Sequence, residues 1–566
     1  MKVVIVGGVA GGATAAARIR RLDEKAEIVV FERSGYISYA NCGLPYYIGD
    51  VINDPRHLTL QTPDSFFSRF RISMKVHHEV TALHPDKKRV SVRNLETGDE
   101  FEESYDKLIL SPGAKPVQPR LPGVDIKKMF TLRTVEDTFR MKEYINHNHP
   151  KSAVLAGGGF IGLELAENLR ELGMDVTIVQ RPRQLMNPFD ADMASLIHNE
   201  VRRHGVKLAL GHTVEGFEEK DGGVSVLLKD GAPLHADMVV LAIGVTPDTG
   251  LAKEAGLELG IKGSIVVNER METSVPDIYA AGDAVQVKHY VTGGDALISL
   301  AGPANKQGRI IADNICGGES HYLGSQGSSV IKVFDMTAAT TGINETNAKK
   351  AGLDVDTVIL SPMSHAGYYP GGRVMTMKVV FEKETYRLLG AQIVGYDGVD
   401  KRIDVLATAI YAGLKATQLK ELDLAYAPSY SSAKDPVNMA GFMIENIEEG
   451  IVKQWYLGQL EELQEKGERG QVTLLDVRTP AEIAFGRIPG FMNIPLDSLR
   501  DHLDELDPAK PIYVICQSGL RSYVACRILA GYGFDAFNFA GGYRYFQTVV
   551  NDRALIEAAF PCGADQ

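Results

Sequence analysis

The first 32 residues alternate between short apolar runs and a turn rich in glycine. Residues 2–6 form an apolar run of mostly β-branched side chains, which predicts a buried strand. A glycine turn and an alanine-rich helix fill residues 7–22, and a second strand at 27–31 ends at Glu32. This order is typical of a dinucleotide-binding unit, in which glycines admit a pyrophosphate and the acid bonds the ribose. Val9 replaces the middle glycine of the strict motif, so the prediction depends on the strand context and on Glu32.

The same order returns over residues 152–180, where a strand, a glycine turn, a helix and a second strand follow one another. This turn keeps all three glycines of the strict motif, which are Gly157, Gly159 and Gly162. The second strand ends at Gln180 instead of an acid, and Arg181 and Arg183 follow it. An acid there favours NADH, whereas nearby arginines hold the 2′-phosphate of NADPH. The chain is therefore predicted to bind a flavin and a nicotinamide, with the choice between NADH and NADPH left open.

Three further apolar runs end in glycine turns, at residues 108–114, 241–247 and 278–283. The last run places Asp283 directly after a strand and a glycine, where a carboxylate can reach the ribityl chain of a flavin. Strands that alternate with helices in this way predict an α/β fold with parallel sheets.

Length, charge and cysteine content narrow the class of protein. The 566 residues predict three or four domains. With 60 Lys and Arg against 72 Asp and Glu, the net charge of −12 argues against broad binding to nucleic acid or to an anionic membrane. No apolar run approaches the roughly 20 residues that span a bilayer, and the chain opens on a strand instead of a signal peptide. The five irregularly spaced cysteines suggest neither a disulfide framework nor a metal site, so we expect a cytoplasmic protein.

One cysteine of the first unit has no near partner. Cys42 lies in the segment Ser-Tyr-Ala-Asn-Cys-Gly-Leu-Pro-Tyr-Tyr at residues 38–47. Flavin disulfide reductases with two cysteines place the second one five positions on, but here that position is Tyr47. A lone thiol beside a flavin must complete its redox couple with a bound thiol, a persulfide sulfur or an oxidised form of itself.

These segments resemble the FAD-dependent pyridine nucleotide–disulfide oxidoreductases. The segment around Cys42 resembles their single-cysteine branch, which contains coenzyme A-disulfide reductase, NADH oxidase and NADH peroxidase. The resemblance implies two Rossmann-like nucleotide-binding domains, with the NAD(P) domain inserted into the FAD domain, followed by an α+β dimerisation domain. The expected boundaries are 1–118 with 248–324 for FAD, 119–247 for NAD(P) and 325–454 for dimerisation.

The resemblance also implies the binding residues and a homodimer. Those assigned to FAD and the nicotinamide are Gly7, Gly8, Ala10, Gly11, Glu32, Arg33, Asn41, Val80, Ser111, Gly113, Arg133, Gly157, Gly159, Ile161, Gly162, Gln180, Gly244, Gly282, Asp283 and Ala301. Those assigned to coenzyme A are Arg18, Arg21, Ser38, Tyr39, Asn41, Asn305 and Arg309. Tyr368 and Tyr426 match the tyrosines that reach the cysteine of the partner subunit in coenzyme A-disulfide reductases. A phenol in this position can bond a leaving thiolate.

The last hundred residues contain a second candidate cysteine. A buried strand at 511–515 ends at the loop Cys516-Gln-Ser-Gly-Leu-Arg521, and a helix follows. Backbone N–H groups at such a turn, the helix dipole and the charge of Arg521 stabilise a thiolate or a persulfide. With Asp476, Arg478 and the Gly-Gly-Tyr at 541–543, this module resembles a rhodanese domain, expected at residues 465–560.

Details of this module refine the prediction. Its six-residue loop suits sulfane sulfur, whereas the related phosphatase loops are one residue longer. Arg487 departs from the His that many rhodaneses have before Ile-Pro-Gly. We expect Cys526 to be buried, and Cys316 and Cys562 to have no role.

A reductase and a rhodanese in one chain resemble the NAD(P)H-dependent coenzyme A-disulfide, persulfide or polysulfide reductases with a fused rhodanese domain. This predicts that Cys42 attacks a coenzyme A persulfide, polysulfide or disulfide, and that Cys516 supplies sulfane sulfur to coenzyme A. Two alternatives stay open. One is an NADH oxidase or peroxidase in which Cys42 cycles through a sulfenic acid. The other is a sulfurtransferase whose flavin half is a regulatory sensor.

Overall fold

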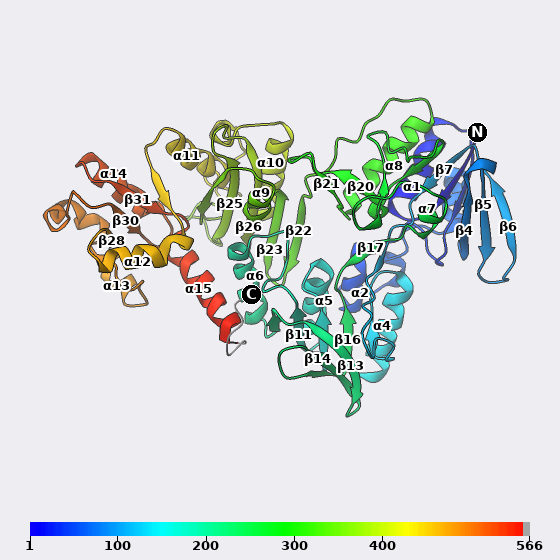
Figure 1. The fold of residues 1–566 in the computed structure, drawn as a ribbon, viewed down its shortest axis with the longest axis horizontal. Helices are drawn as coiled ribbons and strands as arrows, with labels where there is room; N and C mark the ends of the chain where they lie inside the picture. The colour runs from blue at the N-terminus through cyan, green and yellow to red at the C-terminus, as the bar shows by residue number, and fades with distance from the viewer. Residues whose placement is uncertain (559–566) are drawn as a thin grey trace. The chain divides into compact units, whose positions relative to one another are not determined.

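The computed structural model describes residues 1–558 and divides into two compact units. The first unit contains residues 1–185 and 204–327, and the second contains residues 186–203 and those from 328 onward. Figure 1 shows the helices and strands of both units. Cys562 lies outside the described residues. Within the described chain, no helix is both long and apolar enough to cross a bilayer.

The first sheet of the first unit is parallel and has the order β19-β7-β1-β2-β3. Its strands are β1 (Lys2–Val6), β2 (Glu27–Phe31), β3 (Ser73–Lys75), β7 (Lys107–Leu110) and β19 (Ile278–Ala280). Strand β1 is central, and its three middle residues are fully buried, as a two-sided parallel strand requires. Helices α1 (Ala10–Leu22) and α8 (Ala301–Ile315) pack against each other. The approach is close, because a Cβ on Gly308 would lie 2.4 Å from the carbonyl oxygen of Gly11.

The second sheet of this unit repeats the design, with the order β12-β11-β10-β16-β9 and all pairings parallel. Its strands are β9 (Met129–Phe130), β10 (Ser152–Ala156), β11 (Asp175–Gln180), β12 (Lys207–Leu210) and β16 (Met238–Leu241). Helix α5 (Phe160–Glu171) follows the second glycine turn, and helix α4 (Val135–Asn148) begins at a capping box on Thr134. Smaller sheets complete the unit, and two of them are antiparallel with three strands each. The first of these two contains β4 (His78–His84), β5 (Arg89–Asn94) and β6 (Glu100–Ser104), and the second contains β13 (Val214–Lys220), β14 (Gly223–Leu228) and β15 (Leu234–Ala236).

The second unit begins with an antiparallel sheet of order β22-β23-β26-β25-β24. Its strands are β22 (Ser329–Val333), β23 (Met336–Gly342), β24 (Val355–Leu360), β25 (Met375–Glu382) and β26 (Leu388–Gly395). Helices α6 (Ala191–Arg203) and α10 (Val399–Tyr411) pack on this sheet, and α11 (Pro436–Glu448) follows in the chain. Helix α6 lies in the chain between β11 and β12 of the first unit, yet it groups with the second unit.

A parallel sheet of order β27-β31-β30-β28-β29 forms the end of the second unit. Its strands are β27 (Lys453–Trp455), β28 (Thr473–Asp476), β29 (Met492–Asn493), β30 (Ile512–Ile515) and β31 (Ala536–Phe539). The helices around it are α12 (Leu460–Glu468), α13 (Pro480–Ile483), α14 (Leu520–Gly531) and α15 (Gly542–Ala558), as Figure 1 shows. The sheet packs around Trp455, which is fully buried against the ring of Phe539.

The last helix ties this sheet to α6. Helix α15, red in Figure 1, packs along α6, and the side chain of Asp552 between them is only 2 % exposed. One oxygen of Asp552 lies 2.8 Å from Nδ1 of His198, and the other accepts a bond from Arg202. About two turns nearer the start of α15, the hydroxyl of Tyr545 donates to Asp192 at 2.6 Å. Polar pairs buried at this depth must be matched, so they fix how the two helices align.

Removal of the Asp552 carboxylate tests this junction. Burial alone raises the pKa of Asp552, but the bonds from His198 and Arg202 outweigh burial and lower it. The stabilisation is therefore present above the ordinary carboxyl pKa of about 4 and is lost as the pH falls through the lowered value. We expect Asp552→Ala to reduce the free energy of unfolding of this unit by about 3–5 kcal/mol at pH 7, and by less in acid.

Chemical denaturation followed by the fluorescence of Trp455 measures this loss. Asp504→Ala is the matched control, because Asp504 is exposed in the same module and should change stability by less than about 0.5 kcal/mol. Equal effects of the two substitutions would contradict the assignment.

Candidate active sites

The two glycine turns of the first unit are built for a bound dinucleotide. Gly7 has φ +97°, and a Cβ there would lie 2.1 Å from the carbonyl oxygen of Ser111. Gly157 repeats this with φ +119° and a Cβ 2.2 Å from the oxygen of Ala242. By contrast, a Cβ on Gly159 would meet nothing within 4 Å. Backbone crowding therefore requires the first glycine, and the space at Gly159 is open for a pyrophosphate at the start of α5.

Val9 is accommodated because its backbone does not need glycine. It has φ −104° at the start of α1, outside the left-handed region that favours glycine. The third glycine of the first turn is Gly12, whose Cβ would lie 1.9 Å from the oxygen of Gly7. Gly162 plays the same part in the second turn, 2.1 Å from the oxygen of Gly157. Gly12 was missing from the predicted binding residues, although its motif spacing was a usable signal.

Each glycine turn is bonded by the residue at the end of the next strand in the chain. This residue is Glu32 after β2 and Gln180 at the end of β11. Glu32 is buried and accepts bonds from the N–H of Gly8 at 2.8 Å and of Ser34 at 2.9 Å. Gln180 accepts from the N–H of Gly158 at 2.9 Å. The amide of Gln180 lacks the charge of Glu32, so it does not repel a 2′-phosphate as an acid would. This geometry leaves both nicotinamides possible.

Several of the predicted flavin residues come together around Arg133. Its guanidinium pairs with Asp283 at 2.7 Å and donates to the carbonyl of Ala114 at 3.1 Å. Gly113 lies against the same guanidinium, with φ +73°. The backbone N–H of Gly282 donates to Gln307 at 2.8 Å, which joins this turn to α8. The donors, acid and open turns fit a flavin dinucleotide.

Other predicted binding residues are more dispersed. Arg33 pairs with Asp248 at 2.9 Å, and the side chain of Val80 is buried in β4, so only the backbone of Val80 is available to a ligand. Gly244 has φ +111° and open space around it. The remaining positions lie at turns or helix starts next to these groups, and they are Ala10, Gly11, Asn41, Ser111, Ile161 and Ala301.

Cys42 lies on a short 3-10 turn, Asn41–Gly43, directly before helix α2 (Leu44–Ile48). The residue is accessible to solvent, but the protein atoms around the thiol displace enough water to raise its pKa. The charge of Glu164 raises this pKa further, whereas Arg133 lowers it. The thiol is therefore within electrostatic reach of Arg133 and Asp283, two of the residues assigned to the flavin, and its place beside a flavin stays a prediction.

Glu164 was not among the predicted residues. It lies on α5, which packs against α2, and burial together with the charge of Glu167 raises its pKa to about 7. Burial and Glu164 also raise the pKa of Tyr46 to about 12. No local motif marks Glu164, because its proximity to Cys42 depends on the packing of two separate helices.

The position of the missing second cysteine has a packing role. The ring of Tyr47 lies edge-on to Phe139 of α4, with ring centroids 5.7 Å apart. It therefore fills the contact between α2 and α4, and no thiol can take its place without a cavity. Cys42 has to find its redox partner outside this segment.

The predicted coenzyme A residues lie on α1, on α8 and on the segment before Cys42. Thr14 donates to Asn305 at 2.7 Å across the two helices, and Arg21 and Arg309 are exposed. Arg18 already pairs with Asp313 at 2.8 Å, so binding of a phosphate there requires sharing or breaking that pair. Ser38, with φ +43°, Tyr39 and Asn41 complete the set, and their roles stay predictions.

Tyr368 and Tyr426 are brought together in the second unit, with their hydroxyl oxygens 2.9 Å apart. Tyr368 is 77 % exposed, and the bond between the two phenols raises the pKa of Tyr426, so the group stays a hydrogen-bond donor. Buried Arg402 supports the segments that carry them. It donates to the carbonyl of Ser364 at 2.8 Å and pairs with Asp435 at 3.0 Å.

Cys516 directly follows β30 and is fully buried. The N–H of Gly519 and the hydroxyl of Ser522 each donate to its Sγ at 3.2 Å. Gly519, with φ +94°, turns the loop so that these donors face the sulfur at the start of α14. The role of Ser522 as a donor was not predicted, although it directly follows Arg521.

Two arginines flank this loop, and each has its own acid. Arg521 makes a two-pronged pair with Glu482 at 2.6 and 2.8 Å. Arg478 and Asp476 are both almost completely buried and are bonded at 2.8 Å, with the guanidinium 3.7 Å above the ring of Tyr543. The pairing of Glu482 was not predicted either, because its Thr-x-x-Glu spacing signals only a helix cap.

The other cysteines differ from these two. Cys526 is buried in α14 as expected, and burial raises the pKa of its thiol well above the ordinary value. Cys316 is half-buried at the end of α8.

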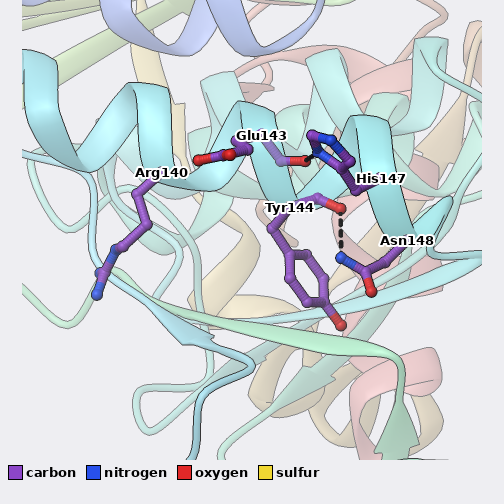
Figure 2. Close-up of a pocket in the computed structure, with 5 residues that line it drawn as sticks. All are labelled: Arg140, Glu143, Tyr144, His147 and Asn148. Atoms are coloured by element: carbon purple, nitrogen blue, oxygen red, sulfur yellow. Dashed lines mark hydrogen bonds between the residues drawn. The ribbon is translucent and has the colours of Figure 1, made fainter.

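A hollow on the exposed face of α4 is not a further active site. Figure 2 shows its lining residues, which are Arg140, Glu143, Tyr144, His147 and Asn148. The amide of Asn148 donates to the carbonyl of Tyr144, and His147 bonds the carbonyl of Glu143. These side chains satisfy their own helix, and none belongs to the predicted sites.

Neutralisation of Glu164 tests its influence on Cys42. We expect Glu164→Gln to lower the pKa of the Cys42 thiol, because the variant removes a negative charge that opposes thiolate formation. The rate of alkylation of Cys42 by iodoacetamide against pH, followed by peptide mass spectrometry, measures this pKa. The shift should appear above about pH 7, where Glu164 is ionised. Glu171→Gln, near the exposed end of the same helix, is the control. An unchanged profile for Glu164→Gln would refute the coupling.

Comparisons with known proteins agree with this geometry. Residues 1–308 match the pyridine nucleotide-disulphide oxidoreductase family, residues 328–436 its dimerisation domain and residues 459–548 the rhodanese-like domain. Coenzyme A disulfide reductase of Staphylococcus aureus is 37 % identical over 442 residues, which cover 78 % of this chain and 99 % of that protein.

Solved structures extend the similarity over both units. The reduced Bacillus anthracis CoADR-RHD is 48 % identical with a TM-score of 0.95, over 98 % of each chain. The NAD-dependent persulfide reductase from A. fulgidus is 38 % identical with a TM-score of 0.90, over 96 % of this chain and all of that one. The water-forming NADH oxidase from Lactobacillus brevis is 30 % identical with a TM-score of 0.76, over 80 % of this chain. The chain is a member of the pyridine nucleotide-disulphide oxidoreductase family that carries a rhodanese domain after its dimerisation domain.

Proposed function

We propose that this chain is an FAD-dependent reductase that uses NAD(P)H to cleave the sulfur–sulfur bond of coenzyme A persulfide, polysulfide or coenzyme A disulfide. The observation that carries the proposal is a lone, accessible thiol at Cys42 in the same chain as a sulfur-transfer loop at Cys516. The relatives named coenzyme A disulfide reductase and NAD-dependent persulfide reductase support this class of substrate.

The dinucleotides bind at the two glycine turns. Gly7, Glu32, Arg133 and Asp283 would hold FAD, and Gly157, Gly159 and Gln180 would hold NADH or NADPH. Bound FAD would accept a hydride from the nicotinamide and would supply two electrons to a disulfide. Gln180 with the exposed Arg181 accepts either nicotinamide in this account.

Cys42 performs the sulfur chemistry. Its thiolate attacks the sulfur attached to coenzyme A, so that a Cys42–S–S–coenzyme A bond forms, the substrate S–S bond breaks and sulfide leaves. With coenzyme A disulfide the leaving group is the thiolate of coenzyme A. Two electrons and a proton then convert the mixed disulfide into the Cys42 thiolate and free coenzyme A.

The raised pKa of Cys42 is compatible with this role. The attack needs a thiolate. Burial and the charge of Glu164 disfavour the thiolate, whereas the charge of Arg133 favours it. Protonation of Glu164 near neutral pH removes a charge that raises the pKa of Cys42, so the protonation state of Glu164 regulates the nucleophile.

The tyrosine pair stabilises the leaving group. We infer that Tyr368 and Tyr426 serve Cys42 of the partner subunit, because the chain matches a dimerisation domain and the two exposed phenols face solvent in one copy. The raised pKa of Tyr426 keeps a proton available to a sulfur anion. The active form is a homodimer in this account.

Cys516 supplies the sulfur. It takes a sulfane sulfur as a persulfide, held by the N–H of Gly519 and the hydroxyl of Ser522, and transfers it to the thiol of coenzyme A. Both reactions need free thiolates, so we place the protein in the reducing cytoplasm.

The similarity to the water-forming NADH oxidase supports an alternative function as an oxidase. That match covers 80 % of this chain, and an oxidase would have no use for the rhodanese module. Oxygen consumption and sulfide release under saturating NADH distinguish the two functions. The reductase account predicts that sulfide release is faster than oxygen consumption when coenzyme A persulfide is present.

Two cysteine variants separate the functions of the two units. We expect Cys42→Ser to lower NAD(P)H-dependent reduction of coenzyme A disulfide by about a thousandfold or more, because the nucleophile is lost. Cys516→Ser should leave this reaction within about twofold, since coenzyme A disulfide needs no sulfur donor. NADH oxidation at 340 nm (the nicotinamide absorbance) measures both, and Cys316→Ser is the matched control. Full activity of Cys42→Ser would refute the proposal.

A further inference from the structure

The cation of the rhodanese loop is paired with an acid. Both terminal nitrogens of Arg521 bond the carboxylate of Glu482, at 2.8 and 2.6 Å. The bond from Arg521 lowers the pKa of Glu482 to about 2, so the acid is ionised throughout the physiological range. The pair therefore carries no net charge beside Cys516.

The second guanidinium near the loop is neutralised in the same way. Arg478 pairs with Asp476, and both side chains are 1 % exposed. Arg478 also donates to the carbonyl of Gly486 at 3.0 Å, in the turn that follows Glu482. Arg487 and Arg544, further along the chain, are exposed, and water and salt screen their charges.

Two exposed apolar side chains lie on the segments that carry Arg521 and Glu482. Leu520 lies in the loop itself, next to Arg521, and is 68 % exposed. Phe485 lies three residues after Glu482 and is 90 % exposed. Because Glu482 is bonded to Arg521, the turn that carries Phe485 lies against the loop that carries Leu520. Exposed apolar side chains beside a buried nucleophile favour a ligand with an apolar chain.

We propose that Glu482 sets the sulfur-donor specificity of Cys516. By holding Arg521, it removes the cation that a compact dianion such as thiosulfate needs, and Leu520 and Phe485 favour an organic persulfide on a neutral, partly apolar chain. A persulfide on a pantetheine-like arm represents this class of donor, and coenzyme A remains the acceptor of the sulfur. The inference rests on the proposed sulfur transfer at Cys516 and names its class of donor.

The transfer step is balanced without an added oxidant. The Cys516 thiolate attacks the terminal sulfur of the donor R–S–S⁻, a bond forms between Cys516 and that sulfur, and the donor's own S–S bond breaks to release R–S⁻. An acceptor thiolate or cyanide then attacks the outer sulfur and regenerates the Cys516 thiolate. With thiosulfate the leaving group would be sulfite, and the electron count is the same.

The experiment uses the full-length holoenzyme with Cys42→Ser, so that only Cys516 reacts with sulfur. The kcat/KM for transfer to cyanide is measured with pantetheine persulfide and with thiosulfate, and their ratio is the readout. Glu482→Gln frees Arg521, and a charge-assisted bond to thiosulfate should lower the ratio about tenfold or more. Glu505→Gln, exposed in the same module, should leave the ratio unchanged.

Two further variants keep the test independent of folding. The double variant Glu482→Gln with Arg521→Met should restore the ratio of the parent, because the effect of Glu482 requires the freed guanidinium. Leu520→Ser should raise KM for pantetheine persulfide several-fold and leave that for thiosulfate unchanged.

The outcomes separate the inference from the function on which it rests. A parallel fall with both donors in Glu482→Gln, or no change in the ratio, would overturn the specificity role while Cys516 remains the transferring residue. Transfer that survives Cys516→Ser would instead refute the proposed function of the loop, and the specificity role with it.

Discussion

Cys42 has no cysteine in its own segment with which to form a disulfide. The other features of its site are explained by that constraint. Tyr47, at the position of the expected partner, is packed against Phe139 between α2 and α4. The second redox partner must therefore enter and leave as a small molecule. An accessible thiol, open glycine turns and an exposed tyrosine pair are what such a cycle requires.

The two reactive thiols are controlled by opposite means. Cys42 is accessible, and burial by neighbouring atoms and Glu164 raise its pKa. Cys516 is fully buried, but an N–H and a hydroxyl point at its sulfur. The first arrangement admits a large substrate and makes reactivity depend on local charge. The second shields a persulfide from solvent and selects the chain that carries it. These environments suit a different reaction at each of the two cysteines.

The local part of this design could be predicted from the sequence. The strands β1 and β10, the glycine turns and the Cys516 loop each depend on a short run of residues whose conformation is set locally. Helices α1 and α5 begin within the glycine motif, at Ala10 and Phe160, and not after its last glycine. There the glycine is required for close packing and does not end the helix.

The remainder depends on contacts between distant segments. Glu482 pairs with Arg521 across 39 residues, Glu164 influences Cys42 across two helices, and Asp552 joins His198 from a helix 354 positions away in the chain. No periodicity or motif announces such pairs, since each partner alone has the pattern of a surface charge. The family resemblance indicated Tyr368 and Tyr426, whose hydroxyl oxygens lie 2.9 Å apart, and their role at the cysteine of the partner subunit stays a prediction.

The most direct test of the central claim is an anaerobic electron count on the holoenzyme after treatment with coenzyme A disulfide. If Cys42 forms the mixed disulfide beside the flavin, titration with NADH should reduce the protein by four electrons per subunit and release one coenzyme A. The Cys42→Ser variant should accept only the two electrons of the flavin and release none. Equal electron counts and equal coenzyme A release in the two proteins would contradict the account.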